Sequence, residues 1–234
     1  MRTVLITGGS SGIGLGLVKR YLKEYYKVIN IDINTPEEKI TGDYHFVYAD
    51  LRKLETLDRV FEEAKSHTKK IDIFIHSAIA PKEPKFSQLS YDTYHEVLNV
   101  NLTSGIFLIK HYVSQFYGEH GRIILISSTR AFMSEEETTL YTLSKGAIQG
   151  LTHSLAMTFS RHKITVNAIA PGWINTKSEK LREIDHQFHP SLRVGEVEDI
   201  VKAALFISDT QNDFFNAQTL VIDGGVTKKM IYPE

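Results

Sequence analysis

The sequence predicts an α/β fold: a doubly wound parallel sheet of about seven strands with helices on both faces. Short apolar runs rich in Val and Ile alternate with longer segments in which apolar residues recur at i, i+3 and i+4. Parallel strands need helix-length connections, and a sheet buried on both faces has continuously apolar strands. None of the six prolines lies inside a predicted helix, so we find no linker and expect one domain over residues 1–234.

The predicted elements alternate along the whole chain. Seven runs have the length and composition of buried strands, namely RTVLIT (2–7), KVINID (27–32), HFVYAD (45–50), IDIFIH (71–76), GRIILIS (121–127), KITVNAIA (163–170) and TLVID (219–223). Segments with helical periodicity lie between them, at about 13–25, 54–67, 91–117, 139–161 and 196–208. Because strands and helices alternate, we expect each pair of strands to be joined by a helical crossover.

Charge and composition exclude several classes of function. The 27 Lys and Arg nearly balance 28 Asp and Glu, for a net charge of −1, so no overall field attracts nucleic acid or anionic lipid. The lack of cysteine excludes thiolate catalysis and thiolate-bound zinc, and the ten histidines show no metal-ligand spacing. No stretch approaches the roughly 20 apolar residues of a membrane span. We therefore expect a cytoplasmic protein that uses no metal and acts on a small molecule.

Four glycines follow the first strand in the stretch LITGGSSGIG at residues 5–14. In an open parallel sheet the ligand crevice lies beyond the carboxyl ends of the strands, and the next helix points its N-terminus into it. Unpaired N–H groups and the helix dipole suit a pyrophosphate there, and glycines let the backbone approach it closely. The spacing G-x-x-x-G-x-G has no following Lys, which disfavours a P-loop. A glycine-rich turn without a ligand is the alternative.

An acidic residue ends the second strand. Asp32 lies eighteen positions after Gly14, close to the roughly 20 at which a carboxylate binds the adenosine ribose of a dinucleotide. Its charge would repel a 2′-phosphate, and residues 33–38 contain no Lys or Arg to attract one. We therefore predict that NAD is preferred over NADP. The alternative is a polar residue that simply ends the strand.

A candidate catalytic group follows the fifth strand. Ser128 lies just past the end of that strand, and Tyr141 and Lys145 are four positions apart in the next helix, so their side chains share one face. Reduction of a carbonyl needs a proton donor, and oxidation of an alcohol needs a base. Tyrosine has an ordinary pKa of about 10, and a nearby ammonium favours the phenolate. We expect Tyr141 to be the acid or base, assisted by Lys145, while Ser128 orients the substrate oxygen. A chance Y-x-x-x-K pair is the alternative.

With these motifs in this order, the chain resembles the short-chain dehydrogenase/reductase family, in its shorter single-domain subdivision, from residue 3 to about 225. The resemblance implies a Rossmann-type fold and hydride transfer between a nicotinamide dinucleotide and a carbonyl or alcohol. It implies that Ser128, Tyr141 and Lys145 are catalytic. It also implies that Asn101, in the stretch NVNLTSG, holds a water in a proton relay.

The resemblance further implies a set of cofactor-binding residues, drawn from the glycine loop, the strand ends, the Y-x-x-x-K pair and the stretch PGWINT (171–176). They are Gly8, Ser11, Gly12, Ile13, Gly14, Asp32, Asp50, Leu51, Ser77, Ala78, Tyr141, Lys145, Pro171, Gly172, Ile174 and Thr176. Asp50 would contact the adenine, and Ile174 and Thr176 the nicotinamide carboxamide and the phosphates. The stretch IDGG (222–225) resembles the end of the family's last strand.

One stretch departs from the family pattern. The usual N-N-A-G after the fourth strand reads His76-Ser77-Ala78-Ile79, which places a side chain where glycine backbone would lie near the ribose. Ser77 can replace one hydrogen bond there. We interpret His76 as a packed residue at the end of the strand rather than a catalytic base.

The region expected to select the substrate is a short loop at about 177–195, which is charged and has few large apolar residues. It indicates a small, polar ketone or secondary alcohol. The run Glu135–Glu137 is interpreted as a solvated loop, with a cationic or polyhydroxyl substrate as the alternative. Apolar stripes on helices 91–117 and 139–161, together with the resemblance, imply a homodimer or homotetramer, and the tail 227–234 could reach a neighbouring subunit.

Two other functions remain open at this point. The first is a catalytically silent protein of the same fold, with a regulatory or structural role, that only binds a dinucleotide; the altered 76–79 stretch favours it, and the intact candidate catalytic residues oppose it. The second is an isomerase or epimerase that oxidises its substrate transiently. The small C-terminal portion leaves little room for the additional substrate domain that such relatives carry.

Overall fold

A seven-stranded sheet forms the centre of the computed structural model, which describes residues 1–81, 84–116 and 120–230. Its strands are β1 (Thr3–Thr7), β2 (Lys27–Asp32), β3 (Tyr44–Tyr48), β4 (Ile73–His76), β5 (Gly121–Ile126), β6 (Ile164–Pro171) and β9 (Thr219–Ile222). All pairs are parallel, in the order β3-β2-β1-β4-β5-β6-β9. The chain winds outward in both directions from the neighbours β1 and β4, which confirms the predicted doubly wound, Rossmann-type sheet.

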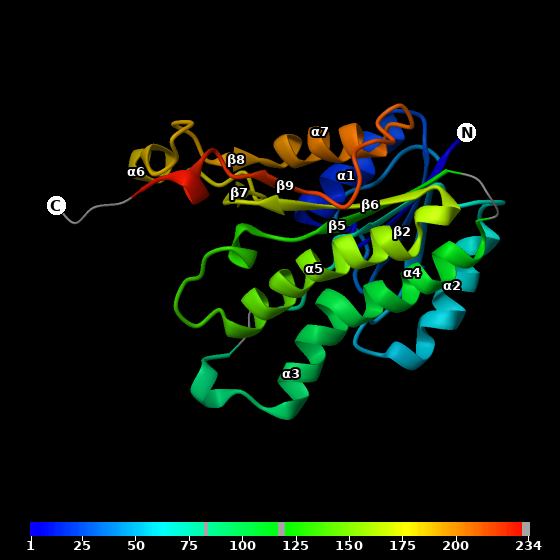
Figure 1. Ribbon diagram of the computed structural model, residues 1–234, viewed down its shortest axis with the longest axis horizontal. Helices are drawn as coiled ribbons and strands as arrows, with labels where there is room; N and C mark the ends of the chain where they lie inside the picture. The colour runs from blue at the N-terminus through cyan, green and yellow to red at the C-terminus, as the bar shows by residue number, and fades with distance from the viewer. Residues whose placement is uncertain (82–83, 117–119, 231–234) are drawn as a thin grey trace.

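Helices cover both faces of the sheet (Figure 1). One face carries α1 (Gly12–Lys23) and α7 (Val197–Ser208), and the other carries α2 (Leu57–Ser66), α4 (Ser104–Ser114) and α5 (Thr139–Thr158). The short helix α3 (Tyr91–Leu98) precedes α4 and contacts α5. Single turns of 3-10 helix span Leu54–Thr56, Phe86–Gln88, Thr129–Ala131, Ser160–His162 and Val226–Lys228.

The central strands are mostly apolar because both faces of the sheet are buried there. Within β1, Val4 and Ile6 pack in a cluster that includes Leu17 of α1, whereas Leu5 packs in a second cluster that includes Leu108 of α4. Side chains of a strand alternate between the two faces, so each face needs its own apolar partners. These two cores hold the carboxyl ends of β1, β2, β4, β5 and β6 at one edge of the sheet.

The segment predicted as one helix over 91–117 is divided into three elements. A π-helix, η3 (Asn99–Thr103), separates α3 from α4, and residue 117 lies outside the described residues. Such a π-turn widens the helix by one residue and often occurs at functional sites. Apolar periodicity does not report it, because contacts from other parts of the chain hold the side chain of Asn101 in this turn.

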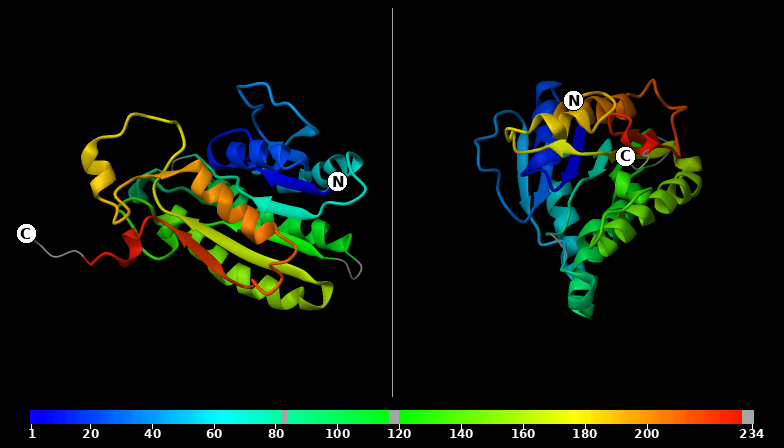
Figure 2. Two further views of the ribbon diagram at one scale, coloured as in Figure 1. Left: turned by 90° about the horizontal axis from the view of Figure 1, so that it is seen from above. Right: turned by 90° about the vertical axis from the view of Figure 1, so that its left-hand side faces the viewer.

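The predicted loop at 177–195 contains structure of its own. It includes α6 (Glu183–Gln187) and leads into β8 (Gly195–Glu196), which pairs with β7 (Ile174–Asn175). This segment lies beside the residues that follow β9 (Figure 2), and the Ser191 amide donates to the Gly224 carbonyl at 3.1 Å. Two-residue strands carry no periodic signal, so the sequence could not predict them. Of the tail 227–234, residues 231–234 lie outside the described residues.

Candidate active site

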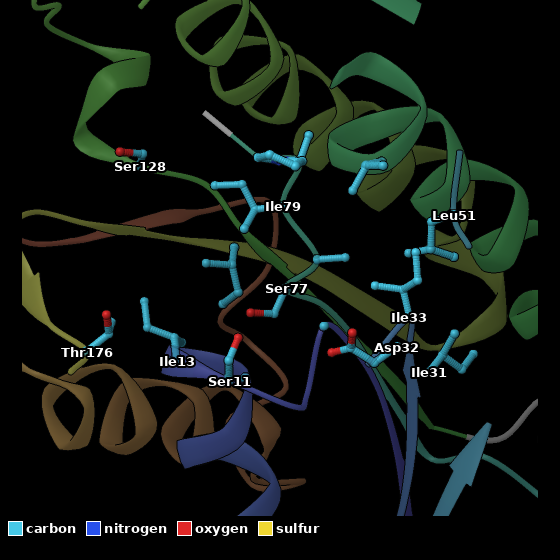
Figure 3. Close-up of a pocket in the computed structure, with 18 of the residues that line it drawn as sticks. Ser11, Ile13, Ile31, Asp32, Ile33, Leu51, Ser77, Ile79, Ser128 and Thr176 are labelled. Carbon is cyan, nitrogen blue, oxygen red and sulfur yellow. The ribbon is translucent and has the colours of Figure 1, made fainter. Parts of the chain in front are cut away.

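A cavity of about 690 Å³ lies at the carboxyl ends of the central strands. All residues predicted to bind the dinucleotide line it, and so does Ser128. Its size is within the range of cofactor and small-molecule sites. Figure 3 shows Ser128 and Thr176 toward one end of the cavity and Asp32 and Leu51 toward the other, with Ser77 between them. The sequence reasoning missed other lining residues: Ile31, Ile33, Asn34, Ala49, Arg52, Ile79, Ala80, Pro81, Val100, Ile126 and Ser127.

The glycine loop is shaped so that side chains could not fit. Gly8 has φ +72°, and a Cβ built on it would lie 2.6 Å from the Cα of Ala78. A Cβ on Gly14 would lie 1.9 Å from the Gly8 carbonyl oxygen. Within the described residues, the Ser11 side chain caps none of the N–H groups at the start of α1, and the first turn carries no acidic residue. The loop therefore fits a phosphate group at the helix N-terminus.

The glycine loop is held by Asn30, a buried residue of β2 that was not predicted from the sequence. The Oδ1 of Asn30 accepts the Gly9 amide at 2.9 Å, and its Nδ2 donates to Ser10 Oγ and Tyr44 Oη, each at 3.0 Å. Asn30 is fully buried. The sequence offered one clue to this role: Asn30 is a polar residue in the middle of an otherwise apolar strand. Buried polar groups require partners, so such a residue is expected to bind a neighbouring segment.

Asp32 is fixed at the end of β2 by backbone donors. Its carboxylate accepts the Ser10 amide at 2.9 Å and the Asn34 amide at 3.1 Å. The same end of the cavity contains Asp50, which the guanidinium of Arg52 holds through two hydrogen bonds of 2.8 Å. These hydrogen bonds from Arg52 lower the pKa of the Asp50 carboxyl below its usual range.

Lys145 and Tyr141 share one face of α5, as predicted from their spacing. The Nζ of Lys145 lies 5.7 Å from the centre of the Tyr141 ring and donates to the Ile126 carbonyl at 2.8 Å. Lys145 is buried, and this burial lowers its pKa to about 8. Ser128 lies on the loop after β5, where its Oγ accepts the Arg130 amide at 3.2 Å. In this geometry the Ser128 hydroxyl proton can be donated into the cavity.

Asn101, by contrast, is not among the residues that line the cavity. Its side chain is buried, with Oδ1 accepting the Ala80 amide at 2.7 Å and Nδ2 donating to Ser144 Oγ at 3.0 Å. Ser144 Oγ in turn donates to the Tyr141 carbonyl at 2.8 Å. Asn101 thus ties the loop after β4 to the turn of α5 that carries Tyr141 and Lys145.

The stretch after β4 that departs from the family pattern forms part of the cavity wall. Ser77, Ala78 and Ile79 line the cavity, and Ile79 is 54% exposed. His76 is buried at the end of β4, in agreement with its interpretation as a packed residue.

Two regions linked with the substrate from sequence do not reach this cavity. None of the described residues 177–195 lines it. Glu135 pairs with Arg130, and Glu137 accepts the Phe86 amide at 2.7 Å, so these two glutamates bind neighbouring loops. We detect no group of three or more His, Asp or Glu side chains that could hold a metal among the described residues. In the same part of the chain, no helix has the length and apolar character needed to cross a membrane.

Comparison with known proteins gives the same assignment as the motifs. A family model described as enoyl-(acyl carrier protein) reductase matches residues 8–227. An uncharacterized oxidoreductase of Thermotoga maritima is 31% identical, over 100% of this chain and 98% of its own length. The 2-dehydro-3-deoxy-D-gluconate 5-dehydrogenase of Escherichia coli is 27% identical, over 96% of this chain and 94% of its own.

A solved structure extends the likeness to three dimensions. The 4-hydroxyisoleucine dehydrogenase complexed with NADH superimposes with a TM-score of 0.90 and 28% identity, covering 98% of this chain and 100% of that chain. The chain therefore belongs to the short-chain dehydrogenase/reductase family and is an oxidoreductase of that type.

Proposed function

We propose that the protein is an NAD(H)-dependent oxidoreductase that acts on a small, polar ketone or secondary alcohol. One observation carries the proposal: a single cavity is lined at one end by the candidate catalytic side chains and elsewhere by a glycine loop that excludes side chains. When bound, the dinucleotide supplies or accepts the hydride at the substrate carbon. The residues of the chain must then manage the proton and the charge on the substrate oxygen.

Tyr141 is proposed to exchange that proton. In reduction its phenol donates the proton to the carbonyl oxygen as the alcohol forms, and in oxidation the phenolate takes the proton from the alcohol. The hydroxyl of Ser128 donates a hydrogen bond to the same oxygen and holds it within reach of Tyr141. The Arg130 amide supports this role because it donates to Ser128 Oγ at 3.2 Å and leaves the hydroxyl proton for another acceptor.

Lys145 is proposed to stabilise the phenolate by its charge. A pKa of about 8 leaves most of its ammonium charged at pH 7, even though the side chain is buried. Its bond to the Ile126 carbonyl holds the ammonium near the Tyr141 ring. Asn101 is proposed to act indirectly, because it positions α5 through Ser144.

We propose that NAD is preferred over NADP because the far end of the cavity keeps a net negative charge. Arg52 lies there, but the Asp50 carboxylate neutralises it through two hydrogen bonds. Asp32 therefore remains to accept ribose hydroxyls and to repel a 2′-phosphate. The solved relative with NADH bound supports a nicotinamide dinucleotide in this fold.

The proposed substrate class is small and polar. Relatives named for 2-dehydro-3-deoxy-D-gluconate and for 5-keto-D-gluconate support a hydroxy acid or its ketone. A homodimer or homotetramer is also proposed, because Phe107 of α4 and Leu143 and Met157 of α5 are partly exposed. Light scattering on the purified protein measures the assembly directly.

Tyr141→Phe tests the catalytic proposal. We expect it to abolish turnover, by at least about 10²-fold, because it removes the proposed proton donor while keeping the ring. Turnover is followed by NADH absorbance with 5-keto-D-gluconate, 2-dehydro-3-deoxy-D-gluconate, 4-hydroxyisoleucine and an acetoacetyl thioester as the panel. NADH binding, measured by calorimetry, is the control and should change little.

Full activity of Tyr141→Phe would show that another group moves the proton. If the wild-type protein binds NADH but turns over none of the panel, the silent dinucleotide-binding protein becomes the better description. If it binds neither NADH nor NADPH, the proposed function is wrong.

A further inference from the structure

His76 fills a buried gap between the sheet and α4, next to the cavity. The residue is 3% exposed. A Cβ built on Gly105, near the start of α4, would lie 2.9 Å from Cδ2 of the ring and 3.0 Å from Nε2. The Cδ2–Nε2 edge of the imidazole therefore faces the start of α4 and the π-helix η3 that precedes it. Nε2 has no hydrogen-bond partner among the described residues, which is unusual for a buried nitrogen.

The opposite ring nitrogen faces the dinucleotide loop. Nδ1 of His76 lies 2.8 Å from Oγ1 of Thr7, the residue directly across from it in β1. The same Oγ1 accepts the Ser77 amide at 3.2 Å and the Ala78 amide at 3.3 Å. A threonine oxygen has two acceptor positions and one proton. The Ser77 amide is shared with the Thr7 carbonyl, which it also contacts at 3.2 Å. Because two N–H groups point at Oγ1, we assign the Thr7 hydroxyl proton to the bond with Nδ1 and the ring proton to Nε2.

The protonated Nε2 thus lies at the π-helix. The backbone carbonyls of Asn101 and Val100, both in η3, favour the protonated ring. Burial and the positive charge of Lys145 act against them and lower the His76 pKa to about 4, so the ring stays neutral and Nε2–H is a neutral donor. A neutral N–H group can attract the carbonyls of η3 without placing a second positive charge beside Lys145.

We propose that His76 is a positioning residue with two separate tasks, one for each ring nitrogen. Nδ1, through Thr7, holds the backbone of Ser77 and Ala78 against Gly8 and so shapes the cofactor loop. Nε2–H makes no direct hydrogen bond among the described residues; it lies against the start of α4, and its attraction to the carbonyls of η3 helps to place Asn101, which in turn ties Ala80 to Ser144 beside Lys145. The functional meaning of this link rests on the proposed dinucleotide-dependent activity.

The tautomer is the first test, and it needs neither cofactor nor substrate. Protein labelled with ¹⁵N in its histidines is examined by long-range ¹H–¹⁵N correlation, and the signal missing from His76→Asn assigns the ring. We expect the proton on Nε2, with Nδ1 unprotonated, and a neutral ring at pH 6. A proton on Nδ1 would overturn the proposal, because Thr7 would then not be the donor.

Two matched variants separate the two tasks. In His76→Asn the shorter amide can accept from Thr7 but cannot reach η3, whereas in His76→Gln the longer amide can donate to η3 but leaves Thr7 unpaired. We expect His76→Asn to bind NADH within about twofold of wild type while deuterium exchange in peptides covering 99–105 becomes about fivefold faster. We expect His76→Gln to keep that exchange within about twofold and to weaken NADH binding about fivefold.

A purely packing role predicts a different result. It would change NADH binding and exchange together in both variants, and that outcome, like no change in either, contradicts the proposal. Failure of wild-type protein to bind NADH would refute the proposed function, while the tautomer and the exchange of 99–105 would still decide the role of His76. If one variant does not fold, the tautomer of the wild-type ring is enough to support or refute the proposed role of His76.

Discussion

Single side chains at the far end of the cavity are proposed to select between the two nicotinamide dinucleotides. Asp32 is rigid because two backbone amides hold its carboxylate, so its charge and acceptor positions are fixed before a cofactor arrives. Arg52 is the one basic residue in the cavity lining at this end among the described residues, and it is bound to Asp50. The balance of charge therefore depends mainly on Asp32.

Asp32→Asn tests this balance with minimal change of shape. The amide keeps one oxygen to accept backbone N–H groups but loses the charge, so we expect NADH binding to weaken about tenfold through the loss of charge-assisted hydrogen bonds. NADPH binding should weaken less or improve, because the repulsion of the 2′-phosphate is removed. Calorimetry with both dinucleotides measures the difference. Glu37→Ala, which removes a carboxylate from the same loop outside the cavity lining, is the control, and equal weakening of both dinucleotides by Asp32→Asn would contradict the assignment.

At the scale of elements, two helices contribute opposite parts of the cavity wall: α1 begins at the glycine loop, and α5 carries the candidate catalytic side chains. The start of α1 is pressed against the glycine loop, because Gly14 packs directly on the Gly8 carbonyl. Helix α5 presents Tyr141 and Lys145 from the other face of the sheet, and the π-helix η3 contacts it through Asn101 and Ser144. The site thus depends on how closely each helix approaches its neighbours.

Glycine-to-alanine changes in the two helices should have opposite effects. A Cβ at Gly14 meets rigid backbone at 1.9 Å, so we expect Gly14→Ala to lower the free energy of unfolding by about 2–3 kcal/mol and to weaken NADH binding. Gly150, in the middle of α5, has no described atom within 4 Å of its Cβ position apart from its chain neighbours and the adjacent backbone of the helix itself. Gly150→Ala should therefore raise the free energy of unfolding by about 0.5–1 kcal/mol. Urea denaturation measures both, and a neutral result for Gly14→Ala would show that α1 can shift away from the loop.

Over the whole molecule, the protein holds ionisable groups in the apolar interior at the functional edge of the sheet. Lys145 and His76 are both almost fully buried, and burial lowers the pKa of each. Such groups cost stability when they must be charged, so the site is maintained by the rest of the fold. The two apolar clusters on either face of the sheet supply that support.

The stability of the folded protein should accordingly depend on pH through His76. Its pKa falls from 6.5 in the unfolded chain to about 4 in the folded protein, so between these values the unfolded chain binds a proton that the folded protein does not. The unfolding free energy of wild type relative to His76→Asn should therefore fall as pH drops from 6.5 to 4, by up to about 3 kcal/mol. Urea denaturation across this range measures the difference, with the exposed His153→Asn as control for loss of a histidine. If the difference in unfolding free energy between wild type and His76→Asn stays constant over this pH range, the pKa of His76 is the same in the folded and unfolded chain.

The strands and helices of this protein are largely determined by local sequence. Alternation of Val- and Ile-rich runs with helical periodicity predicted the doubly wound sheet, because buried strands and amphipathic helices each have a local repeat. The boundaries shifted by a few residues; β3, for example, ends at Tyr48 rather than Asp50. The glycine loop, Asp32 and the Y-x-x-x-K pair, which all line the cavity, could be picked out because they are short patterns or lie a fixed number of residues apart along the chain.

Tertiary structure alone decided how these elements meet. The π-helix breaks a regular repeat, and the Asn30 support of the glycine loop and the contacts of His76 on two sides join residues far apart in the sequence. Likewise, residues 177–195 contribute nothing to the cavity lining, and Ser191 among them bonds to Gly224 after β9. Periodicity and motif spacing report the chain's own neighbours, whereas hydrogen bonds and burial between distant segments exist only once the chain has folded.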